Sequence, residues 1–239
     1  MKEMNHLLSS QPTTSAFEAF ANFLEEQWEE GLELSSQDIS NLVEQLEGWP
    51  SEVPRWAPHH WVHEDSEFLL LCTHAIIDIQ VTSNQDLQRI LSIGHFENIL
   101  ELECALYEPM TRESARVMGA PSALPSLRKL SLGFCLTDEV LGPLFGSEGS
   151  SSLQHLALDD NELTDDAVGL LSSFPLAKQV KSLTLRNNLI TSFSLDERWV
   201  ALESLDLREN PLTKPQHDNL AALASREPNM KIILDPLAP

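Results

Sequence analysis

A short pattern of apolar and polar positions recurs along this chain. In residues 153–161, leucine stands at the first, fourth and sixth positions and asparagine at the ninth. Side chains alternate along a strand, so positions 4 and 6 of this frame point to the same side. The frame recurs in residues 127–135, 180–188 and 202–210, with Cys135 in place of asparagine in the first of these. One such strand cannot bury its own apolar side, but a stack of them can.

Two weaker copies of the frame come earlier in the chain. Residues 76–84 keep every position, whereas residues 99–107 keep the apolar positions and have Tyr107 where asparagine is expected. Successive frames therefore begin at residues 76, 99, 127, 153, 180 and 202, an irregular period of the length known for leucine-rich repeats. We expect the asparagine at position 9 to bond backbone groups of the neighbouring turns.

On these residues, the chain resembles the leucine-rich repeat family over about residues 70–235. Its Thr-Asp pairs at 137–138 and 164–165 are similar to those of the ribonuclease-inhibitor-like subclass. The resemblance implies an α/β fold: a leucine-rich repeat solenoid with a curved parallel sheet and helices on its convex side. It also implies a protein that binds other proteins, without indicating which.

The segments between the predicted strands should return as helices. Helices are predicted at 86–93, 111–118, 138–145, 165–171 and 215–224, with threonines 111, 137 and 164 as N-caps. Residues 192–199 have room only for a short 3₁₀ or extended return. The chain should finish with an edge strand over residues 230–234.

The N-terminal part has a different pattern. Residues 1–13 are predicted to be disordered or loosely docked, and a capping box from Ser15 to Glu18 should open a first helix. A second helix should begin near Ser35 or Ser36 and end at Gly48. We therefore predict three regions: a helical cap (1–48), a connector rich in Pro, Trp and His (49–65), and the solenoid (66–239) of about six repeats with a C-terminal edge strand.

The connector holds three tryptophans and several histidines close together. The indoles either pack against the first repeat or form an exposed binding patch. His59, His63 and Glu64 have donor atoms suited to a metal, but no cysteine or second histidine pair accompanies them. We therefore predict no metal and no other cofactor.

The charge balance and the number of cysteines limit the classes of partner and the cellular compartment that fit the sequence. The chain has 15 basic and 37 acidic side chains and a formal net charge of −22. That balance argues against nucleic acid or anionic membranes as partners and permits a cationic protein, although it also serves solubility. Three cysteines give no disulfide framework, and no long apolar run is present. We expect a cytoplasmic monomer.

Catalysis is not predicted. No nucleophile elbow or Cys-His signature is present. His155 and Asp159 fall on the same side of one predicted strand, which is only a weak acid–base pattern.

The frame also predicts where a partner binds. If positions 4 and 6 face the core, positions 3, 5 and 7 face the concave side and position 8 lies at its rim. The candidates for partner binding are Glu101, Glu103, Leu106, Phe134, His155, Asp159, Asp160, Arg186 and Arg208. Leu106 and Phe134 are either exposed apolar contacts or tucked into the loop layer. The small residues Ser131, Gly133 and Ala157 leave room for a ligand.

Two functional hypotheses follow. The first is a protein-interaction module that holds its partner on the concave face. The second is an inhibitor or immunity-type protein that neutralises a cationic enzyme such as a nuclease; an enzyme ranks last. Like charges on one surface repel, so reversing Glu101, Glu103, Asp159 and Asp160 is expected to leave stability unchanged or slightly improved.

Overall fold

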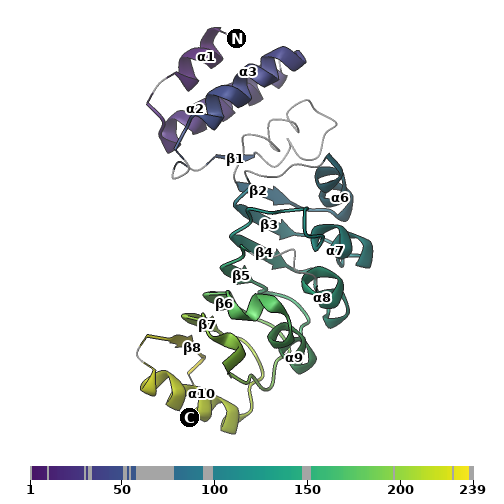
Figure 1. The fold of residues 1–239 in the computed structure, drawn as a ribbon, viewed down its shortest axis with the longest axis vertical. Helices are drawn as coiled ribbons and strands as arrows, with labels where there is room; N and C mark the ends of the chain where they lie inside the picture. Colours follow the sequence, from purple (N-terminus) through teal and green to yellow (C-terminus); the bar gives the residue numbers. More distant parts are fainter. Residues whose placement is uncertain are drawn as a thin grey trace.

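The computed structural model describes residues 2–9, 11–29, 31, 34–50, 53, 55–57, 78–93, 99–146, 152–195, 197–227 and 229–236. Within them, eight strands form one open parallel sheet in which spatial order follows chain order (Figure 1). The strands are β1 (Trp56–Ala57), β2 (Asp78–Val81), β3 (Glu101–Ala105), β4 (Lys129–Gly133), β5 (His155–Ala157), β6 (Ser182–Thr184), β7 (Ser204–Asp206) and β8 (Lys231–Ile233). The fold is therefore of the α/β class, as predicted.

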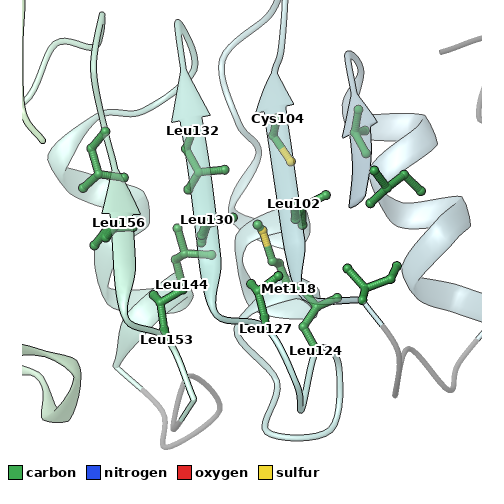
Figure 2. Packing of buried hydrophobic residues seen from close by; sticks show 14 of the residues in the cluster. Leu102, Cys104, Met118, Leu124, Leu127, Leu130, Leu132, Leu144, Leu153 and Leu156 are labelled. Carbon is green, nitrogen blue, oxygen red and sulfur yellow. The ribbon is translucent and has the colours of Figure 1, made fainter. Parts of the chain in front are cut away.

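The strand register confirms the repeating frame. Position 4 of each strand lies opposite position 4 of the next, from Leu102 to Leu130, Leu156, Leu183 and Leu205. These leucines are buried. Figure 2 shows Leu102, Leu130 and Leu156 side by side on neighbouring strands, with Leu127 and Leu153 in the bends that enter the strands. One face of the sheet therefore supplies a continuous apolar layer.

Helices cover that apolar face. They are α6 (Asn84–Ile93), α7 (Arg112–Met118), α8 (Asp138–Phe145) and α9 (Asp165–Ser173), all on one side of the sheet (Figure 1). Met118 of α7 and Leu144 of α8 reach the strand leucines (Figure 2). The return segments close to the carboxyl end of the chain are the 3₁₀ turns η2 (Pro175–Lys178) and η3 (Glu197–Trp199) and the helix α10 (Lys214–Arg226). The predicted helices are confirmed, with ends that differ by up to two residues.

Two of the three predicted threonine caps form as expected. The hydroxyl of Thr111 accepts a hydrogen bond from the amide of Ser114 at 3.1 Å, and that of Thr164 accepts from Asp166 at 3.2 Å. Thr137 stands at the N-cap of α8 but makes no such bond.

Buried and partly buried asparagines join one unit of the stack to the next, where a unit is a strand with its turn and return segment. Asn161 donates to the Leu132 carbonyl at 2.7 Å and accepts from the amides of Cys135 and Leu136 at 2.9 and 2.8 Å. Asn188 repeats the pattern by donating to Leu158 and accepting from Leu163. Asn210 does the same for the unit before it. The predicted backbone role of position 9 is confirmed, and we call this series the asparagine ladder.

A second series of bonds runs beside it at the helix starts. Asp138 accepts the amide and hydroxyl of Thr164, and Asp165 accepts those of Thr191, the amide at 2.7 Å. Partial burial alone would raise the pKa of Asp165, but the hydrogen bonds from Thr191 and Ser192 outweigh it and hold the pKa below its ordinary value. A carboxylate at each helix N-terminus also matches the helix dipole.

The N-terminal region differs from the sequence prediction at its start. Residues expected to be loose form the helix α1 (Lys2–Leu8), whose Met4 and Leu8 are buried. The next helix, α2 (Thr14–Glu29), is capped not from Ser15 but by the Thr13 hydroxyl, which accepts from Ala16 at 3.1 Å. The prediction missed α1 because its apolar positions are too few to show a period.

The second predicted helix forms as expected. It is α3 (Ser36–Glu47), opened by a capping box between Ser35 and Asp38 and ended at Gly48.

The predicted connector contributes β1 to the sheet and meets the helices. The ring of Phe17 in α2 lies 5.1 Å from that of Trp56 and 6.5 Å from that of Trp49. Arg55 is buried and donates to the Leu46 carbonyl of α3. These two indoles are therefore packed, but their ring contacts within the described part of the chain are with α2 and not with the first repeat, where the sequence placed them. Trp61, His59, His63 and Glu64 lie outside the described residues.

Among the helices of the described residues, none is both long enough and apolar enough to cross a bilayer.

We expect substitution of a strand leucine to be costly. Leu156→Ala or Leu183→Ala should lower the free energy of unfolding by about 2–5 kcal/mol, because each leaves a cavity in the layer shared by three units. Leu170→Ala, on the partly exposed side of α9, should change it by less than about 0.5 kcal/mol. Urea denaturation measures all three, and a Leu156→Ala protein as stable as wild type would contradict the packing described.

Candidate binding surface

The face of the sheet opposite α6–α9 carries frame positions 3, 5 and 7, and we call it the open face. No described helix packs on it (Figure 1). Side chains such as Glu103, Lys129 and His155 are exposed there. Parallel sheets are usually covered on both faces. An uncovered face of polar and small side chains is therefore the first candidate for a binding surface.

The glutamates on the open face already have partners. Glu101 forms an ion pair with Lys129 at 2.8 Å, and Glu103 accepts a hydrogen bond from the Gln80 amide at 3.2 Å. Lys129 and His155 lie opposite each other on β4 and β5. An acidic and a basic side chain are thus paired between β3 and β4 on this face.

Asp159 has a structural role that the sequence did not reveal. Its carboxylate is half-buried and accepts the Arg186 amide at 2.7 Å and the Thr184 hydroxyl at 3.0 Å. Burial raises its pKa above the ordinary value despite these two bonds. No hydrogen bond joins Asp159 to His155 among the described residues, so the weak acid–base pattern gains no geometric support.

Both candidate arginines are engaged within the chain. Arg186 pairs with Glu209, and the Arg208 Nε lies 3.0 Å from a carboxylate oxygen of Asp206. Burial would raise the pKa of Asp206, but the bonds from Arg208 outweigh it and lower that pKa. An acidic partner group would therefore have to compete with Glu209 and Asp206 for these guanidinium groups.

The turns at the carboxyl ends of β3–β7 form a second surface, which we call the loop edge; it comprises residues 106–109, 134–137, 160–162, 187–189 and 209. Four residues at frame position 8 have positive φ: Phe134 (61°), Asp160 (56°), Asn187 (49°) and Glu209 (61°). This conformation turns the chain out of the strand and presents the side chain at the edge. The side-chain amide of Asn187 donates a hydrogen bond to the Asp160 carboxylate at 2.8 Å and holds it there.

The unit with β3 departs from this pattern. Leu106, at its position 8, is fully buried and is not among the positive-φ residues, so of the two alternatives for Leu106 the one tucked into the loop layer holds. Tyr107 is instead 91 % exposed, whereas Phe134 in the next unit is 68 % exposed. The size of the residue at position 9 accounts for the difference. Cys135 is small and buried in the next unit, whereas Tyr107 remains exposed and the leucine before it fills the buried place.

Three of the five exposed large apolar side chains found in the described residues lie on the loop edge. They are Tyr107, Phe134 and Leu189. The sequence frame flagged only Phe134; the signal for Tyr107 was its place in an asparagine position, and none pointed to Leu189. A surface depression of about 300 Å³ lies beside Phe134, lined also by Pro109, Leu136, Asp160 and Glu162.

Metal and thiol chemistry find little support in the described part of the chain. No group of three or more candidate metal ligands occurs there, and the predicted histidine set lies outside it. Cys104 and Cys135 are free and buried, and burial raises the pKa of the Cys135 thiol to about 12. Such a thiol is protonated near neutral pH and is a poor nucleophile.

No protein-family model matches this chain, and no curated protein matches it either.

The hydrogen bonds of Asp159 predict that its replacement lowers stability, whereas repulsion between like charges predicted unchanged or slightly improved stability. Asp159→Ala should lower the free energy of unfolding by about 1–3 kcal/mol, because it leaves the Arg186 amide and the Thr184 hydroxyl without their acceptor. Glu103→Ala, on the same face but exposed, should change it by less than about 0.5 kcal/mol. Chemical denaturation near neutral pH measures both; equal stability of the two variants would show that Asp159 is merely a surface charge.

Proposed function

We propose that this chain is a protein-interaction module of the leucine-rich repeat family that binds a partner protein across the open face. In this proposal the sheet is curved with the open face concave, and α1–α3 cap its first strand. The in-register leucines and the asparagine ladder support the repeat architecture. The contacts of Phe17 and Arg55 with β1 and α3 support the capping role.

The observation that carries the binding proposal is the uncovered parallel sheet. Ser131, Gly133 and Ala157 are small and lie near its centre, between exposed charged side chains on either side. A partner can therefore approach the backbone closely there while polar groups fix its orientation. Small residues at the centre and charged ones around them suit a protein surface better than a deep small-molecule pocket.

A second candidate function is inhibition of a cationic enzyme, such as a nuclease, by covering its basic cleft. The net charge of −22 favours it. However, the open-face acids are paired, and residues 1–70 alone carry 14 acidic and two basic side chains. The net charge therefore favours long-range attraction of a cationic partner to the whole chain, and does not by itself place that partner on the open face.

Blocking the open face should abolish partner binding. The full chain is used to capture a partner from lysate of its native host at low salt, and affinity for the purified partner is then measured by calorimetry. Ser131→Tyr with Ala157→Tyr should weaken binding at least about tenfold, since both bulky side chains would stand where the partner approaches. Tyrosine is well tolerated in strands, so the melting temperature should hold.

The matched control places the same two tyrosines away from the face, as Ser122→Tyr with Ser173→Tyr, and should leave affinity unchanged. Undiminished binding by the open-face variant would overturn the proposal. Salt then separates the two functions: a fall of about tenfold or more in association rate between about 0.05 and 0.5 M salt indicates the inhibitor of a cationic enzyme.

A further inference from the structure

The exposed apolar side chains of the loop edge stand on the turns of the β3, β4 and β6 units, with the turn of the β5 unit between the last two, and we call this row the strip. Ala105 and Gly133 are opposite each other in the sheet, which places the turns that follow them, with Tyr107 and Phe134, side by side. The Phe134 amide donates to the Asp160 carbonyl at 2.9 Å, and the Leu189 amide donates to Leu163 at 2.9 Å. Neighbouring strands are about 4.8 Å apart, so the strip from Tyr107 to Leu189 spans roughly 14 Å.

Phe134 is an unusual residue for its place in this strip. Left-handed backbone is tolerated by asparagine and aspartate and is unfavourable for bulky side chains. Asn187 and Asp160 occupy equivalent positions with φ of 49° and 56°, whereas Phe134 holds φ at 61° and stays 68 % exposed. Phe134 therefore gains little from burial to offset the backbone cost, and a contact with another molecule would supply that gain.

The surroundings of Phe134 combine an apolar floor with an acidic rim. The depression beside it has Cys135 and Leu136 in its lining, and both are buried. Asn161 also lines it, but its side chain is engaged by backbone groups in the ladder. Asp160 and the exposed Glu162 stand on one side. Arg186, in the unit after Asp160, is already paired with Glu209.

We propose that the loop edge binds an extended, basic segment of the partner protein. One apolar side chain of that segment occupies the depression beside Phe134, and lysine or arginine side chains next to it contact Asp160 and Glu162. This inference rests on the proposed function as a protein-binding module but places the anchor on a different surface, beside the open face.

The length of the strip and the volume of the depression both fit an extended peptide segment. A strip of roughly 14 Å matches about four residues of extended chain. The depression of about 300 Å³ is open and accepts one side chain rather than enclosing a small molecule. Acidic groups on the rim repel nucleic acid and attract lysine and arginine.

Selection from a library of random peptides of about twelve residues, displayed on phage and applied to the immobilised full chain, tests the proposal. Enriched peptides should carry an apolar residue flanked by at least two basic residues and few or no acidic ones. The best of them is then synthesised, and its affinity is measured by fluorescence anisotropy.

Phe134→Asn is the decisive variant. It should lower affinity for the peptide at least about tenfold while its melting temperature stays at or above that of wild type, because asparagine suits the positive φ. Glu162→Lys should weaken binding about threefold to tenfold. The controls are Val200→Asn, which alters an equally exposed apolar residue elsewhere, and Glu197→Lys; both should bind as wild type.

Three results would overturn the proposal: no enrichment, enriched peptides without basic residues, or equal affinity for Phe134→Asn and wild type. The open-face variant Ser131→Tyr with Ala157→Tyr separates this inference from the proposed function. This double variant should still bind the peptide but should no longer bind the whole partner protein. If the partner is lost by that variant but binds Phe134→Asn and Glu162→Lys normally, the open-face function stands and the loop-edge anchor fails.

Discussion

The asparagine ladder is the interaction on which the rest of this structure depends. The turns that leave the strands expose backbone amides and carbonyls to a buried layer, where an unpaired group costs about 1–3 kcal/mol. Asn161 alone engages the backbone of Leu132, Cys135 and Leu136 in the preceding unit. Because Asn188 and Asn210 make equivalent bonds in the next units, the ladder fixes the register of β4–β7 and the direction of the turns that follow β4, β5 and β6.

That constraint determines which side chains reach a surface. With the turns held in one geometry, frame position 8 points outward at the loop edge, and positions 3, 5 and 7 point to the open face. The unit of β3 has Tyr107 at frame position 9, and there the pattern shifts so that Leu106 is buried and Tyr107 is exposed, whereas the unit of β4 keeps the pattern with the small, buried Cys135 at that position. A large aromatic residue at a position that elsewhere holds asparagine or cysteine thus adds an exposed aromatic side chain in the turn next to that of Phe134.

Much of the architecture could be predicted from the sequence, because period and burial follow from the same residues. The strand leucines, the helix positions and the backbone role of asparagine all came from a frame repeated six times. The helix α1 and the strand β1 were missed, since neither is long enough to show a period. Charge misled in a different way: Asp159 has the frame position of a surface acid, but its bonds to Arg186 and Thr184 depend on the next strand.

Net charge was the least informative guide to the candidate site. The acidic excess is densest in residues 1–70, whereas the open face pairs Glu101 with Lys129 and Asp206 with Arg208. The loop edge gains its character from three exposed apolar side chains and a few acids around them. Those residues lie in separate units, and only the stacking of the units brings them together.

Hydrogen exchange at the turn amides tests the ladder most directly. The amides of Cys135, Leu136, Leu163 and Ile190 each donate to a ladder asparagine, although they lie in turns. In the wild-type protein they should exchange as slowly as the strand amides of β4 and β5, since both open only when the units separate. Exchange of these four amides at the rate of an unstructured peptide, while the strands remain protected, would contradict the account.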